Sequence, residues 1–175
     1  MPSPRTGIEP QIHESAFIAP TAVIIGDVII EEGVNIWFGT VIRGDWGQIL
    51  VGKNTSIQEN VSVHCPPAQP VKIGSNCIIA HGAIIHGPCE IGDGCLVGMG
   101  SKVIHNSKLG AGSLLAAGAV LTNKEIPPNS LAVGIPAEVK KQLKHKPGVQ
   151  PAKGYVENGR VFKEFFEKNP EYLKY

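Results

Sequence analysis

The chain has 175 residues, a length typical of one domain, and with 42% hydrophobic and 18% charged residues its composition is that of a folded protein. Lys and Arg number 16 against 15 Asp and Glu, and this net charge of +1 argues against a nucleic-acid-binding surface. The first residues, MPSPRTGIEPQ, lack the layout of a signal peptide, and no apolar run approaches the ~20 residues that span a bilayer. We therefore expect a cytoplasmic protein.

From Ile18 onwards, aliphatic residues recur at every sixth position in three runs that differ in phase. The runs consist of Ile18, Ile24, Ile30, Ile36 and Ile42; Val51, Ile57 and Val63; and Ile73, Ile79, Ile85, Ile91, Val97, Val103, Leu109, Leu115 and Leu121. A small or β-branched residue follows most of them four positions later, as at Val28, Cys77 and Ser101. An amphipathic helix would repeat about every 3.6 residues and a half-exposed strand about every two, so neither explains this pattern.

A six-residue repeat has a direct structural meaning. Each hexad forms one short strand and one corner, so that three hexads close a triangular coil of about 18 residues. The aliphatic side chain points inward and stacks on its equivalent one coil later, while strands of successive coils lie ~4.8 Å apart in parallel. We therefore predict an all-β solenoid, a parallel β-helix of hexapeptide repeats, over residues 1–136.

Two insertions interrupt the repeat. Val51 follows Ile42 by nine positions, and Ile73 follows Val63 by ten, where the repeat would have six. The extra residues fall in Arg43–Gly47 and in Cys65–Pro70. We expect both insertions to be loops at corners of the coil, because loops of repeat proteins often carry the functional residues.

The repeat ends near Ile126, and residues 137–175 are predicted to form a helical C-terminal segment. A first helix is expected over residues 137–146, a linker over 147–154 and a second helix over 159–168. The apolar residues of the second helix are Val161, Phe162, Phe165 and Phe166. We expect the helices to pack alongside the coil and to protect its open end.

Four cysteines, Cys65, Cys77, Cys89 and Cys95, are not spaced as a cysteine zinc site would require. In a chain without an export signal we expect them to be reduced thiols. Cys77 and Cys95 lie 18 residues apart and should stack in adjacent coils.

Two histidines are predicted to lie side by side. His64 follows Val63 and His86 follows Ile85, so both hold the same position in their hexads. Their separation of 22 residues equals one coil of 18 plus the four extra residues of the second insertion, which places them ~4.8 Å apart on one face. Outward imidazoles at this spacing can ligate one ion, with Zn–N distances of about 2.0–2.1 Å.

His81 lies across a corner from this pair and cannot reach the same ion within one chain. In a threefold assembly of parallel prisms, His81 of one copy would meet the His64–His86 pair of the next. Each site would then have three neutral imidazoles and open positions for solvent, as in catalytic metal sites. We interpret His105, one coil further on, as a surface residue, whereas His13 and His145 are expected to lie outside the coils.

The segments around these residues are VIRGD at residues 41–45, IQENVSVH at 57–64 and HGAIIHG at 81–87. Together they closely resemble the gamma class of carbonic anhydrases. The likeness runs from about residue 10 to residue 145, and it is strongest to the branch of ferripyochelin-binding-protein-like, phenylacetate-operon and carnitine-operon proteins. It implies a left-handed coil, a homotrimer, and a metal site of His64, His81 and His86 that holds Zn2+, or alternatively Fe2+ or Co2+.

The resemblance also implies a function and further site residues. The implied reaction is reversible hydration of CO2 to bicarbonate by a metal-bound hydroxide, since such a cation lowers the pKa of bound water toward ~7. Gln58 matches the residue that hydrogen-bonds the metal-bound solvent. Arg43, Asp45 and Glu59 match an interface set in which an arginine pairs with a carboxylate of the next subunit; for Arg43 and Asp45 the alternative is a direct catalytic role.

The chain departs from the family pattern at two places. Trp46 stands where well-studied members carry a glutamate, and the short Cys65–Pro67 stretch replaces an acidic loop. Both glutamates serve proton transfer in those enzymes. Glu59, or Tyr155 from the C-terminal segment, is a candidate substitute.

Other functions are compatible with the repeat. A hexapeptide acyltransferase shares the coil and the trimer but uses one interfacial histidine as general base, so three histidines at metal spacing argue against it. A non-catalytic binding or assembly module and a thioesterase are the remaining alternatives that the sequence leaves open.

Overall fold

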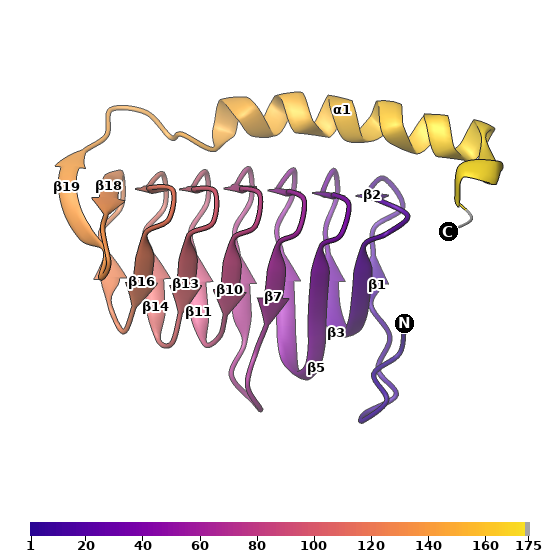
Figure 1. Ribbon diagram of the computed structural model, residues 1–175, viewed down its shortest axis with the longest axis horizontal. Coiled ribbons are helices and arrows are strands. Elements are labelled where there is room, and N and C mark those ends of the chain that lie inside the picture. Colours follow the sequence, from indigo (N-terminus) through magenta and orange to yellow (C-terminus); the bar gives the residue numbers. More distant parts are fainter. Residues whose placement is uncertain (174–175) are drawn as a thin grey trace.

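The computed structural model describes residues 1–173 and shows a parallel β-solenoid of about 7 turns with one long helix along its side (Figure 1). The expectation of a parallel β-helix of hexapeptide repeats is confirmed. Within the described residues, no helix combines the length and the apolar character needed to cross a bilayer.

The strands form three faces. The face that we call the histidine face contains the first halves of β3 (Val23–Ile30) and β5 (Val41–Val51), then β7 (Ser62–His64), β10 (Ile84–His86), β13 (Lys102–Ile104) and β16 (Val120–Thr122). The second face contains β1 (Gln11–Ile12), the second halves of β3 and β5, β8 (Val71–Ile73), β11 (Cys89–Ile91), β14 (Ser107–Leu109) and β17 (Glu125–Ile126). The third, which we call the helix face, contains β2 (Phe17–Ile18), β4 (Asn35–Ile36), β6 (Ser56–Ile57), β9 (Ile78–Ile79), β12 (Leu96–Val97), β15 (Leu114–Leu115), β18 (Ser130–Val133) and β19 (Glu138–Gln142).

The core lies inside the prism and consists of the residues that the six-residue period selects. All the predicted inward aliphatic residues are buried except Ile18, which is half-buried in the first coil. They stack in register: Ile57 pairs with Ile79, and Ile79 pairs with Val97. The period therefore identified the core correctly, because each inward side chain covers its equivalent in the next coil.

Several corners require a left-handed backbone. Asn54, Asn60 and Asn76 have φ values of 57°, 59° and 56°, and glycines hold equivalent corners in other coils. Asparagine tolerates positive φ better than most side chains, which explains why it alternates with glycine here.

The insertion at Arg43–Gly47 is not the loop that the sequence predicted, because it is part of the continuous strand β5. The neighbouring strand β3 crosses the same corner and pairs Gly26 with Gly44. A Cβ atom at Gly26 would lie only 2.3 Å from the Gly44 carbonyl oxygen, so glycine permits this close approach. The second insertion, residues 65–70, is a loop between β7 and β8, as predicted.

The C-terminal prediction was wrong in two respects. Residues 138–142 form strand β19 and not a helix, because they pair antiparallel with β18 and cover the last edge of the helix face. The second helix, α1 (Val149–Lys168), begins ten residues earlier than predicted and includes part of the expected linker. The residue before the helix, Gly148, packs closely on the coil, since a Cβ there would lie 2.2 Å from the Cys95 carbonyl oxygen.

The structure describes the chain after α1 as far as residue 173. A short 3-10 helix, η1 (Pro170–Leu173), follows α1, whereas residues 174–175 lie outside the described residues. The division of the chain into units of 1–136 and 137–175 stays a prediction.

Helix α1 lies on the helix face and runs back along the solenoid toward the N-terminal coils (Figure 1). Its aromatic residues Phe162 and Phe166 pack against Phe17, Trp37 and Phe38 of the first coils. The expectation that a C-terminal helix packs alongside the coil is confirmed.

Candidate metal centre

Two imidazoles lie one above the other on the histidine face, as predicted. His64 ends β7 and His86 ends β10, and the two residues are direct partners in the parallel register. Their ring centroids are 5.3 Å apart. The hexad alternation turns Val63 and Ile85 into the core and therefore turns both histidines outward.

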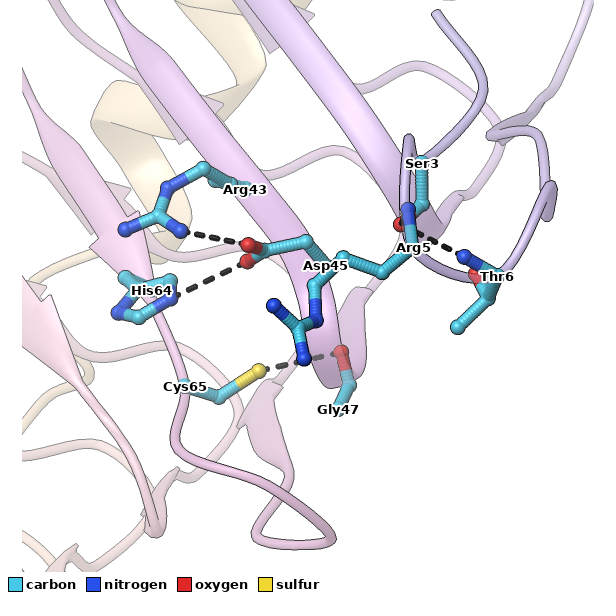
Figure 2. Close-up of polar contacts among 8 residues, drawn as sticks. All are labelled: Ser3, Arg5, Thr6, Arg43, Asp45, Gly47, His64 and Cys65. Atoms are coloured by element: carbon cyan, nitrogen blue, oxygen red, sulfur yellow. Dashed lines mark hydrogen bonds and ion pairs between the residues drawn. The ribbon is translucent and has the colours of Figure 1, made fainter.

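Asp45 and Arg43 project from β5 beside His64 (Figure 2). The Arg43 guanidinium donates to Asp45 Oδ2 at 2.6 Å, and the other carboxylate oxygen, Oδ1, lies 3.2 Å from His64 Nε2. Burial alone would raise the pKa of Asp45, but the hydrogen bond and the charge of Arg43 together hold that pKa below its usual value. Arg43 therefore pairs with a carboxylate of its own chain and keeps it ionised.

The surroundings of His64 favour its neutral form. Its burial is the main cause that lowers the pKa of the ring, and the positive charge of Arg43 lowers the pKa further, against the opposing effect of Asp45. A neutral imidazole is the form that binds a metal ion.

One ring nitrogen of His86 differs from the other polar atoms of the site in its hydrogen bonding. Its Nδ1 atom is buried and has no hydrogen-bond partner among the described residues. A buried polar atom without a partner is costly, and a missing ion or partner group is one established reason for it. Together with the two stacked imidazoles, this atom fits a nitrogen-rich site of the kind that zinc, iron or cobalt prefers.

His81 lies at the corner between β9 and β10, held by the two residues Gln58 and Glu59 of the coil before it. Gln58 is buried, and its Oε1 atom accepts the backbone N–H of His81 at 3.2 Å. Glu59 Oε2 lies 2.7 Å from His81 Nδ1. Sequence reasoning found all three residues but not these contacts, which depend on side-chain orientation.

The chain does not bring His81 to the other two histidines. His81 precedes strand β10, whereas His86 ends it, so the two residues lie at opposite edges of the histidine face. Within residues 1–173, no group of three or more His, Cys, Asp or Glu side chains is arranged to hold a metal ion.

Tyr155 is not beside the histidine pair either. It lies in α1, its ring contacts Trp37 at 5.8 Å between centroids, and it lines a groove of about 350 Å³ on the helix face together with Gln58. This surrounding is mostly apolar and does not favour the predicted role of Tyr155 in proton transfer.

His105 is a surface residue near the histidine pair, as predicted, but the sequence did not predict how closely its ring approaches His86. The His105 ring lies 5.6 Å from that of His86, between centroids, and its backbone N–H donates to the His86 carbonyl. His105 is exposed and has a left-handed φ of 49°. The signal was its spacing of 19 residues from His86, which is one coil plus one residue.

The two departures from the family pattern form the corner beside Asp45. The Arg5 guanidinium lies over the exposed Trp46 ring, 3.5 Å from its centroid. The Cys65 thiol donates to the Gly47 carbonyl at 3.1 Å (Figure 2). Burial raises the pKa of Cys65, so this thiol is a neutral donor at neutral pH.

Comparison with known proteins agrees with this architecture. The family model "Bacterial transferase hexapeptide (six repeats)" matches residues 9–44 and 88–123. A "Probable carbonic anhydrase" of Methanocaldococcus jannaschii is 45% identical over 133 residues, which cover 75% of this chain and 83% of that protein. A "Carbonic anhydrase" of Geobacillus kaustophilus is 38% identical and covers 91% of this chain and 90% of its own length.

A plant protein and a bacterial crystal structure are also similar to this chain. "Gamma carbonic anhydrase 2, mitochondrial" of Arabidopsis thaliana is 34% identical over 87% of this chain, which spans only 58% of the plant protein. The crystal structure of a putative acetyltransferase from Bacillus cereus is 36% identical, with a TM-score of 0.87 over 90% of this chain and 94% of that one.

Proposed function

Because this chain belongs to the gamma-class carbonic anhydrase family of hexapeptide-repeat proteins, we propose that it hydrates CO2 reversibly to bicarbonate at a metal site shared between the copies of a homotrimer. The observation that carries the proposal is the register of His64 with His86, which sets two outward imidazoles 5.3 Å apart between ring centroids. We further propose that His81 of a neighbouring copy is the third ligand.

The donor set fits a divalent metal. Three neutral imidazoles with free coordination positions are the arrangement of catalytic zinc sites, and the buried, unpartnered Nδ1 atom of His86 supports a missing group at this place. When bound, the metal supplies a Lewis acid that makes a nucleophile available from water at neutral pH. Zn2+ is our first candidate, with Fe2+ or Co2+ as alternatives that imidazole also suits.

The other residues of the chain orient and hold these ligands. Asp45, kept ionised by Arg43, accepts from His64 and fixes its ring. The Oε1 atom of Gln58 is occupied by the backbone of His81, so its amide N–H groups remain to hold solvent or substrate. We assign Arg43 and Asp45 to ligand positioning, with the proposed contact to the neighbouring copy as their second role.

Metal analysis and activity measured on one sample test the proposal. The protein is purified anaerobically, its metal content is quantified, and CO2 hydration is followed on that sample. We expect about one metal ion per chain and an activity that chelation removes and metal addition restores. A metal-free protein that transfers acyl groups from coenzyme A would instead identify an acyltransferase, and a metal-loaded but inactive protein a binding module.

We also propose a cytoplasmic location. It is supported by the similarity to archaeal and bacterial proteins, whereas the plant relative is mitochondrial, and fluorescence microscopy of the tagged chain in its own cell tests it.

A further inference from the structure

Two consecutive residues of one coil hold the histidine of the next. The Gln58 side chain accepts the backbone N–H of His81, and the Glu59 carbonyl accepts the N–H of Gly82 at 2.9 Å. The Glu59 carboxylate then meets the ring itself, with Oε2 2.7 Å from Nδ1. The main chain of His81 is thus fixed on both sides, and the carboxylate fixes the ring.

The chemistry of the two groups determines the tautomer of the ring. An ionised carboxylate only accepts hydrogen bonds, so Nδ1 of His81 must carry the proton that this contact needs. In a neutral imidazole the other nitrogen, Nε2, then keeps its lone pair. Many metal-binding histidines are oriented in this way by a carboxylate on the nitrogen opposite the metal.

We propose that Glu59 is a positioning residue that holds His81 as the Nδ1–H tautomer and directs Nε2 toward the metal held by the neighbouring copy. This inference rests on the proposed function, since it assumes that His81 is a ligand. It gives Glu59 a role other than proton transfer. The His81 and Glu59 side chains are 42% and 36% exposed, so both are within reach of an adjoining copy.

The geometry parallels that of the other ligand-bearing element. Asp45 Oδ1 lies 3.2 Å from His64 Nε2 and comes from the coil before it, as Glu59 does for His81. The nitrogens differ: Asp45 engages Nε2 and leaves Nδ1 of His64 free, whereas Glu59 engages Nδ1 and leaves Nε2 of His81 free. Each side of the proposed interface therefore carries its own carboxylate–imidazole pair. The ligands are oriented before the copies meet, which lowers the conformational entropy lost when the site forms.

Nitrogen-15 NMR of labelled histidine reports the tautomer directly. In the metal-free wild-type protein we expect His81 to be the Nδ1–H form. In Glu59→Ala we expect both tautomers, and in Glu59→Gln, whose amide oxygen still accepts, mainly the wild-type form. A wild-type His81 with its proton on Nε2 would overturn the inference without any variant.

Zinc affinity, measured by competition with a chromophoric chelator, is the second readout. Removal of an orienting carboxylate should weaken binding by about 10–100-fold in Glu59→Ala, with partial rescue in Glu59→Asp and Glu59→Gln. Glu9→Ala, which removes an exposed carboxylate of the N-terminal segment, should bind like the wild type. Size-exclusion chromatography and circular dichroism of each variant separate lost folding or assembly from lost positioning.

The two proposals fail in different ways. If the wild-type protein binds no zinc, the proposed function fails. If the wild-type protein binds zinc and folded Glu59→Ala binds it equally well with an unchanged tautomer, only the role of Glu59 is overturned.

Discussion

Three side chains were candidates for proton transfer at the proposed site or stand where the family carries such a group. At the corner next to Asp45, Trp46 cannot accept a proton, and its ring is covered by the Arg5 guanidinium. Glu59 is engaged by His81, and Tyr155 lies among aromatic residues on the helix face. None of these three residues is therefore well placed to carry protons from the proposed site to solvent.

Turnover should consequently depend on proton acceptors in solution. We expect the rate constant kcat for CO2 hydration to rise several-fold as the concentration of an imidazole buffer increases at fixed pH and ionic strength, while kcat/KM changes little. Trp46→Glu should reduce this dependence by supplying an internal acceptor. Stopped-flow assays check both statements, and a kcat that does not change with buffer concentration would show that another group of the chain transfers the proton.

The cysteines should be unreactive in the folded protein because all four are buried, including Cys95, whose pKa is lowered by its hydrogen bond with the Cys77 thiol. All four are free and buried, and burial raises the pKa of Cys89 to about 12. At pH 8 this thiol is far below its folded pKa and stays neutral, whereas the thiolate is the reactive form. Titration with a colourless aromatic disulfide should detect no thiol in the native protein and four after denaturation. Rapid reaction of the native protein would indicate opening of the coil.

The parts of the site that follow from residue spacing along the chain were predictable from the sequence. The stacking of His64 on His86 follows from the coil length and the size of the second insertion, and the register confirms it. The contacts of Glu59 and Asp45, and the approach of His105 to His86, depend on rotamers and corner geometry that no six-residue period contains.

At the scale of elements, the helix α1 is held by a few aromatic contacts. The Phe162 ring lies 5.1 Å from that of Trp37 and 5.9 Å from that of Phe17, between centroids. The neighbouring Phe165 is 47% exposed, and its ring pairs within residues 1–173 are with Phe166 and Tyr172, near its own end of the chain.

These two phenylalanines make a matched pair of variants. Phe162→Ala should lower the free energy of unfolding by about 2–3 kcal/mol, because a half-buried aromatic ring leaves a cavity. Phe165→Ala should cost about 1 kcal/mol or less. Urea unfolding at one fixed protein concentration measures both values, and equal losses would mean that α1 is not anchored through Phe162.

The corner between β3 and β5 depends on glycine for two separate reasons. Gly26 has a φ of 84°, and an added Cβ would meet the Gly44 carbonyl oxygen at 2.3 Å. Gly118 has a similar φ of 69°, but no atom of residues 1–173 that could clash lies within 4 Å of an added Cβ. The pair therefore separates backbone strain from steric overlap.

We expect Gly118→Ala to cost about 1–2 kcal/mol, the price of a left-handed alanine. Gly26→Ala should cost more than about 3 kcal/mol, since the backbone of β5 must also move. Thermal and urea unfolding of the two variants compare these losses. If both variants lost the same free energy of unfolding, the strands β3 and β5 would be able to move apart at little cost, and the steric overlap at Gly26 would not contribute.

The strands of the coil were predicted correctly because a single six-residue period runs through them. The prediction failed at residues 138–142, whose sequence is compatible with both a helix and a strand. The inward residues of the coil were found because each occupies the sixth position. In contrast, residues 138–142 carry too few apolar side chains to distinguish a helix from an edge strand. The free edge of β18, which is a tertiary feature, decides in favour of β19.

For the whole molecule, the solenoid is a rigid prism that holds residues at fixed intervals on different edges. His64 and His86 lie at the end of two strands of the histidine face, and His81 lies at the opposite edge of that face. A prism of this kind cannot fold these edges together. A complete three-histidine site therefore requires a second copy, and the proposed function requires assembly.

Subunit mixing tests this claim most directly. His64→Ala and His81→Ala are each expected to lose tight zinc binding and CO2 hydration. When the two variants are unfolded, mixed in equal amounts and reassembled, roughly a quarter of the interfaces should join an intact His64–His86 pair to an intact His81 if copies associate at random. We predict that zinc binding and activity return to about that fraction of the wild-type level. Mixed assemblies that form but bind no zinc would contradict a site shared between copies.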